Sequence, residues 1–202
     1  WGAAWGFAEA TLGYVLHMLH VPAVGAWMFP VALFCMFAAM RHSRQASTPF
    51  AVAAVAAAVK LSDLLFIAPL PFWYVTNPAG HILIEGAMTA LFVFVVDRFA
   101  IKRFPAVAAT ALTAMASVVI LQTLWQLAIS ETVDHNPAID LLRSDGSRML
   151  LSLAACVAKS LILSGAWIVY TAFSRRGKAI AIPVWSASLA LVSALCITWI
   201  TA

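Results

Sequence analysis

The sequence predicts an all-α membrane protein with a single transmembrane domain of seven helices over residues 1–202. Hydrophobic residues make up 64% of the chain and charged residues 10%, whereas a soluble domain is about half apolar and a quarter charged. The mean hydropathy is +0.96. No loop between the apolar runs is longer than about 20 residues, which leaves no room for a soluble domain.

Seven apolar runs have the length of a membrane-spanning helix. They cover approximately residues 1–19, 24–40, 49–68, 80–97, 105–129, 149–173 and 180–201. At ~1.5 Å rise per residue, 17–25 residues cross a ~30 Å hydrocarbon core. The first run lacks the basic region and cleavage site of a signal peptide, so we expect it to be a spanning helix. Pro30 is expected to kink the second run.

The basic residues predict how the helices are oriented. Eight of the twelve Lys and Arg residues lie in the alternate loops RHSRQ (41–45), RFAIKR (98–103) and SRRGK (174–178). By the positive-inside rule these loops are cytoplasmic, which places the N-terminus inside and the C-terminus outside. We therefore expect an integral protein of a bacterial plasma (inner) membrane. The net charge of +4 is explained by this orientation, so no nucleic-acid partner is predicted.

The cysteines predict packing rather than chemistry. Cys35, Cys156 and Cys196 lie in three different apolar runs, and none belongs to a CxxC pair. This pattern favours small buried apolar residues over a disulfide or a thiolate metal site.

Two similar stretches contain the only asparagines of the chain, Asn77 and Asn136, each followed by Pro-Ala. An Asn before Pro often starts a turn or caps a helix, because its side chain accepts hydrogen bonds from free N–H groups of the first turn. We therefore expect two helix N-caps on the outer face, and a fourth helix that begins close to residue 80.

Four ionisable residues lie within the hairpin formed by residues 60–85: Lys60, Asp63, His81 and Glu85. A charge at membrane depth costs roughly 2.5–3.5 kcal/mol on insertion scales, so these groups must face each other, water or a ligand. Lys60 and Asp63 share a helix face at i, i+3, which allows them to pair. His81 and Glu85 share a face at i, i+4.

The first run places an acid near the middle of the membrane. Gly2, Gly6, Glu9, Gly13 and His20 fall roughly on one helix face. Small residues on such a face let a neighbouring helix approach closely. We therefore expect Glu9 to point into the bundle.

Polar residues from five helices are predicted to converge in the outer half of the membrane, in a pocket that opens outward. The predicted solute-binding residues are Glu9, Lys60, Asp63, Glu85, Gln122, Gln126 and Lys159. His17 and His81 are expected at the entrance. Loop residues predicted to form the rim are Glu131, Asp134, His135 and Asp140.

Three acids at depth (Glu9, Asp63 and Glu85) outnumber the two lysines of the pocket. An unpaired buried carboxylate is either protonated or bound to a cation. The first hypothesis is therefore a transport-type protein that binds a small polar or cationic solute at mid-depth.

Two other hypotheses use the same residues. In the first, His17, His20, His81 and Glu85 hold a divalent metal such as zinc in a membrane-embedded enzyme, although no HExxH motif is present. A bis-histidine haem between His17 and His81 is a variant of this hypothesis. In the second, the charges form internal pairs that stabilise an accessory subunit of a larger membrane complex. The Gly- and Ala-rich faces also permit a homo-oligomer.

Overall fold

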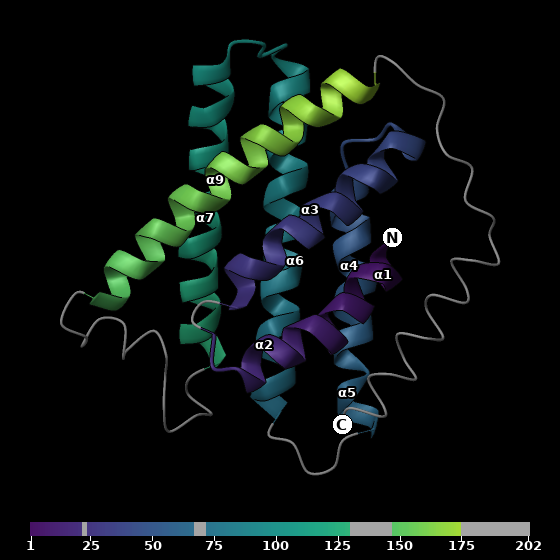
Figure 1. Ribbon diagram of the computed structural model, residues 1–202, viewed down its shortest axis with the longest axis vertical. Coiled ribbons are helices and arrows are strands. Elements are labelled where there is room, and N and C mark those ends of the chain that lie inside the picture. Colours follow the sequence, from purple (N-terminus) through teal and green to yellow (C-terminus); the bar gives the residue numbers. More distant parts are fainter. Residues whose placement is uncertain (22–23, 67–71, 130–146, 175–202) are drawn as a thin grey trace.

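The computed structural model describes residues 1–21, 24–66, 72–129 and 147–174, and within these ranges the chain is helical with no strand. The elements in chain order are α1 (Gly2–Ala8), the π-helix η1 (Glu9–Gly13), α2 (Tyr14–Met18), α3 (Val24–Ser43), α4 (Thr48–Leu61), α5 (Asp63–Phe66), α6 (Phe72–Arg98), α7 (Phe104–Ile129) and α9 (Ser147–Ser174). Figure 1 shows them as a bundle in which α9 lies obliquely to α6 and α7 and runs in about the same direction as α3.

Five helices are long and apolar enough to cross a membrane, which identifies an all-helical membrane protein. These candidate spans are Val24–Ser43, Thr48–Leu65, Val75–Arg98, Phe104–Ala128 and Leu150–Ser174. The predicted first span is helical but is divided by η1, and it is not one of the five. The predicted seventh span, 180–201, lies outside the described residues. The count of seven and the direction of the chain therefore stay predictions.

The helices pack mainly against their neighbours in the chain. α4 lies along α6, α6 along α7 and α7 along α9, while α3 contacts both α4 and α9. The loops after α3 and α6 and the C-terminal end of α9 all lie toward the same end of the bundle (Figure 1). We call this the basic end, because its loops and helix termini carry Arg41, Arg44, Arg98, Lys102 and Arg103.

Glycines allow the closest helix contacts, as the small-residue pattern predicts. A Cβ atom added to Gly2 would lie 2.5 Å from Cβ of Val55, and one added to Gly6 would lie 2.8 Å from Cβ of Val59. α1 therefore rests directly on α4. Gly86 of α6 meets Ala53 of α4 even more tightly.

Aromatic residues fill the core near the basic end. Phe37 of α3 stacks on Tyr170 of α9 with ring centroids 5.3 Å apart, and Phe92 of α6 meets Trp167 edge-on at 5.8 Å. Cys35 and Cys156 are buried and unbridged, which confirms the packing role predicted for them. Cys196 lies outside the described residues.

The predicted start of the fourth helix is wrong. α6 begins at Phe72, so Asn77 and Pro78 lie inside the helix and Asn77 is not an N-cap. A membrane helix tolerates an internal Pro because neighbouring groups compensate the hydrogen bond that is lost. The aromatic residues before Asn77 are apolar enough to extend the helix. Asn136, the second predicted cap, lies outside the described residues.

Candidate intramembrane polar site

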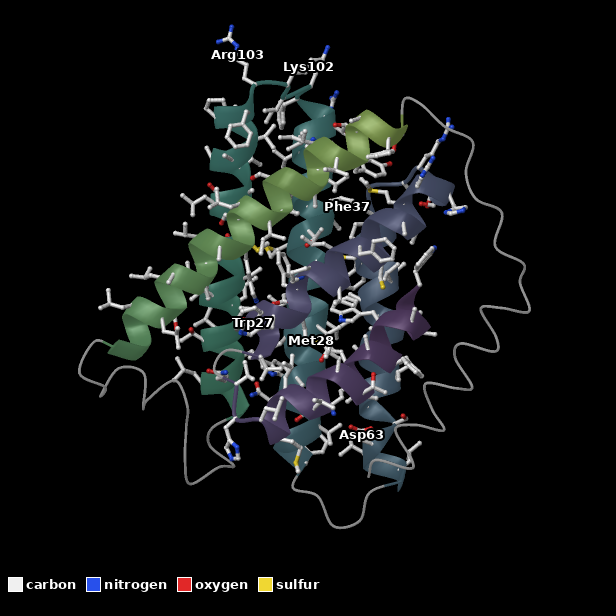
Figure 2. All side chains as sticks on the ribbon, in the orientation of Figure 1. Trp27, Met28, Phe37, Asp63, Lys102 and Arg103 are labelled. Carbon is white, nitrogen blue, oxygen red and sulfur yellow. The ribbon has the colours of Figure 1, made fainter. Side chains whose placement is uncertain are left out.

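Polar side chains lie from the middle of the long helices toward the end opposite the basic end. Figure 2 shows Asp63 toward the end opposite Lys102 and Arg103. We use the term polar cluster for this group, whose members come from η1, α4, α5, α6, α7 and α9. The polar cluster consists of Glu9, Lys60, Asp63, His81, Glu85, Gln122, Gln126 and Lys159.

The first ion pair joins α4 to α5. Nζ of Lys60 lies 2.7 Å from Oδ2 of Asp63, at the i, i+3 spacing that the sequence analysis singled out. Asp63 is 7% exposed and Lys60 28%. Ser62 separates the two helices, and its Oγ donates a hydrogen bond to the Val59 carbonyl at 2.5 Å. This bond adds to the backbone bonds that Ser62 N–H donates to the Ala58 and Val59 carbonyls at the junction of α4 and α5.

The second ion pair links α6 to α9. Nζ of Lys159 donates to Oε1 of Glu85, and these side chains are only 12% and 8% exposed. The ammonium group also lies 5.2 Å from the ring centroid of Phe29 in α3, a cation–π distance. A single lysine therefore connects three helices. Both charges are shielded from solvent. Removing one of them would therefore leave an unpaired buried charge, which strongly destabilises the folded state.

His81 and Gln126 connect α6 to α7. The two side chains meet at 3.3 Å between Nε2 atoms. His81 was expected at the outer end of its helix, but it lies about two and a half turns after Phe72. The longer α6 therefore places His81 deeper in the bundle than predicted.

Glu9 belongs to neither ion pair. It is the first residue of η1 and accepts a hydrogen bond from Nε1 of Trp5 at 3.0 Å. The charges of Glu85, Lys60 and Lys159 all act on its carboxylate. Among the described residues, both lysines form their ion pairs with the other two acids. Short π-helical segments often occur at functional sites.

A half-open cavity of about 220 Å³ lies between α7 and α9. Its polar lining comes from Gln122, Thr123, Gln126, Ser152 and Lys159. Three of the predicted solute-binding residues therefore line one cavity. Glu9, Lys60, Asp63 and Glu85 do not line it, so the cavity lies to one side of the place predicted between the first, third and fourth segments.

The predicted metal ligands are not assembled in the part of the chain that the structure describes. No group of three or more His, Cys, Asp or Glu there is arranged to hold a metal. His20 follows α2, is exposed, and has a left-handed φ of 53°. The His17 side chain is outside the description, as are the rim residues Glu131, Asp134, His135 and Asp140. The zinc and haem hypotheses stay predictions that no described group supports.

Three further polar side chains were not predicted to belong to the site, although Asn77 was predicted to cap a helix. Asn77 Oδ1, Thr89 Oγ1 and Trp125 Nε1 are buried with no hydrogen-bond partner among the described residues. Asn77 and Thr89 extend the one-turn spacing of His81 and Glu85, so four polar residues follow one face of α6. Extending that i, i+4 pattern in both directions would have found them. Trp125 is fixed against α6, because a Cβ on Gly80 would lie 2.6 Å from its Nε1.

Comparisons with protein-family models, curated proteins and solved structures found no match for the chain. The chemistry of the site therefore rests on its own geometry. The polar cluster offers one carboxylate outside the ion pairs and two amides beside a cavity, and α6 and α7 add buried polar atoms of Asn77, Thr89 and Trp125 that lack partners among the described residues. These are the types of group that line sites for polar ligands.

Proposed function

We propose that this membrane protein binds a small polar or cationic solute at the polar cluster, as a step in transporting it across the bilayer. The observation that supports the proposal is the position of Glu9. Its carboxylate is within electrostatic range of two lysines and a second acid, yet those lysines are already paired with Asp63 and Glu85. Charges at membrane depth are rare and mark pathways for ions and polar solutes.

The balance of charge favours a cation. Three carboxylates and two ammonium groups carry a formal charge of −1 in their ionised forms. A carboxylate inside an apolar bundle is stable only when it is protonated, hydrogen-bonded or paired with a positive charge. The Trp5 indole supplies one hydrogen bond to Glu9, and a bound cation would supply the missing charge.

Neutral groups supply the remaining contacts of the proposed site. The unpartnered atoms of Asn77, Thr89 and Trp125 offer an amide oxygen, a hydroxyl and an N–H donor. Gln122 and Gln126 line the adjacent cavity. A solute with both a positive charge and hydrogen-bonding groups would pair with the Glu9 carboxylate and with these buried polar atoms. Without partners, such buried groups lower the stability of the fold.

The direction of access follows from the basic loops. The positive-inside rule places the basic end on the cytoplasmic side, in what we propose to be a bacterial plasma membrane. The polar cluster then faces the outside, with the N-terminus inside and a seventh helix at 180–201 bringing the C-terminus out. Uptake from outside is the direction that fits this arrangement.

The test measures unfolding of the purified full chain in lipid nanodiscs with methylammonium, guanidinium, choline and putrescine. A cation present at 100 times its Kd stabilises the folded state by about 2.7 kcal/mol. We expect this shift for at least one of the four cations, and we expect Glu9→Gln to abolish it. The matched control is Asp97→Asn, which removes an exposed carboxylate near the basic end of α6 and leaves the shift intact.

Two results would contradict the proposal. In the first, none of the four cations changes the unfolding midpoint of the wild-type protein. The other is a Glu9→Gln variant that keeps the full shift, which would place the cation elsewhere. If no cation shifts the wild-type midpoint and Glu9→Gln only lowers stability, the result supports the accessory-subunit hypothesis instead.

A further inference from the structure

A second, larger cavity lies between α3 and α9, toward the basic end. It is a groove of about 550 Å³, within the ~300–1,000 Å³ typical of ligand sites. Its walls are almost entirely apolar. Pro30 and Phe34 contribute from α3, and Ile162 and Phe173 contribute from α9. Among the described lining residues, Arg41 has the only charged side chain, and His42 and Tyr170 add an imidazole and a phenol.

The length of the groove matches one leaflet of a bilayer. Pro30 and Arg41 are eleven residues apart, as are Ile162 and Phe173, so each wall is about 16 Å long at ~1.5 Å rise per residue. Half of a ~30 Å hydrocarbon core is ~15 Å. The groove therefore has the dimension of one layer of acyl chains.

The floor of the groove is held in place by stacked rings. Phe37 contacts Tyr170 at 5.3 Å and Trp167 at 6.1 Å between centroids, and those two rings stack at 5.5 Å. Phe37 is 7% exposed, whereas Phe34 on the groove wall is 65% exposed. The shape of the groove is thus built into the packing of α3 against α9.

Positive charge is concentrated at one end of the groove. Arg41 and His42 lie in the last turn of α3, and Arg44 follows directly. Lys102 and Arg103 extend from the same end of the bundle, on the side where Figure 2 also places Phe37. The groove is therefore cationic at the membrane surface and apolar along its length, which complements an anionic amphiphile.

We propose that this groove binds one anionic phospholipid, with an acyl chain between α3 and α9 and the phosphate beside Arg41 and His42. Lipid tails are as apolar as the groove itself, so tail contacts alone do not favour one lipid over another. The headgroup provides the selectivity, since basic pockets between membrane helices attract anionic lipids. This site is separate from the polar cluster and does not depend on the solute proposed for it.

The experiment is native mass spectrometry of the full chain with equimolar phosphatidylglycerol and phosphatidylcholine that carry identical acyl chains. We expect one retained lipid per chain, with phosphatidylglycerol strongly preferred. Arg41→Gln should lower that preference about fivefold, the effect of one basic residue near a lipid surface. Arg41→Lys should keep most of it. Ala166→Phe fills the groove without changing charge and should reduce retention of both lipids.

The matched control is Arg103→Gln, which removes a positive charge from the same end of the bundle but outside the groove. It should leave the preference unchanged, as should Glu9→Gln. Equal retention of the two lipids overturns the proposal, and so does an equal loss in the Arg41 and Arg103 variants. An unfolding midpoint in phosphatidylcholine checks that each variant is folded. A cysteine at Phe34 that cross-links to one in residues 180–201 of the same chain, or to a second copy, shows another occupant and also overturns it.

Discussion

The two halves of this bundle are built from different interactions. Toward the basic end, α3 and α9 are joined by the stacked rings of Phe37, Trp167 and Tyr170. In the other half, the same α9 is tied to α6 by the ion pair of Lys159 and Glu85. One helix therefore makes apolar contacts along its C-terminal part and a charged contact in its middle.

The difference shows what each half is suited to bind. Ring stacking leaves a groove of about 550 Å³ that is apolar along its length, whereas the charged half has a cavity of about 220 Å³ with amides and an ammonium group in its lining. Apolar contacts are worth little inside lipid, because the surroundings are equally apolar. Substitutions in the charged half therefore remove strong electrostatic interactions, whereas substitutions in the aromatic half remove close packing.

The largest effect is expected from Glu85→Ala. Removing one partner of a buried ion pair costs about 3–5 kcal/mol of unfolding free energy, because the remaining charge has no counterpart. Denaturation in detergent micelles measures the loss. The double variant Glu85→Leu with Lys159→Met should recover most of it, since neither charge then remains. If the single variant were as stable as the double variant, the unpaired charge would carry no cost. The charged half would then not differ from the aromatic half in the way proposed here.

An intermediate effect is expected from Gly86→Ala, which tests packing one residue away from that ion pair. The added methyl group would overlap Ala53 and lie 3.2 Å from the Pro49 carbonyl oxygen. Overpacking of this kind costs about 1–3 kcal/mol. The matched control is Gly165→Ala in α9, where nothing lies within 4 Å of the new Cβ. That variant should be neutral or slightly stabilised, because Ala favours helix over Gly. Equal loss in both variants would contradict the tight contact of α4 with α6.

The smallest effect is expected from Lys60→Met. Lys60 is 28% exposed, so water reaches the pair from its side, whereas Asp63 is 7% exposed and would lose its partner. The loss should therefore cost about 1 kcal/mol of unfolding free energy, the low end for a buried group left without its partner. The same denaturation measurement applies, and the comparison is with Lys159→Met, which should cost several times more. If the Lys60 variant were as unstable as the Lys159 variant, the two ion pairs would contribute equally to stability, and the predicted difference between them would be wrong.

The sequence predicted what is local and missed what depends on packing between helices. The pairing of Lys60 with Asp63 follows from i, i+3 spacing, and the glycine contacts of α1 follow from one helix face. Glu85 and Lys159 are 74 residues apart. The sequence places both at a similar depth in the membrane, but only the packing of α6 near α9 brings them together as a pair. The spacing of Gln122 and Gln126 likewise gave a shared face but not the cavity that they line.

Three features had no usable signal in one sequence. The π-helix at Glu9–Gly13 changes the helical phase, so residues placed on one face by regular spacing separate, and His20 is exposed. The internal Pro78 reads as a helix start, although the surrounding bundle extends α6 past it. The groove between α3 and α9 comes from the way these two helices pack against each other, which hydropathy does not encode.

The link between Lys159 and Glu85 also constrains the order in which the chain enters the membrane. Ribosomes deliver α6 before α9, so Glu85 is already in the bilayer when Lys159 arrives. A lone lysine at mid-depth opposes insertion by roughly 2.5–3.5 kcal/mol, and a waiting carboxylate offsets that barrier. We therefore expect the segment that carries Lys159 to insert less efficiently in a chain without Glu85, in addition to the loss of folded stability.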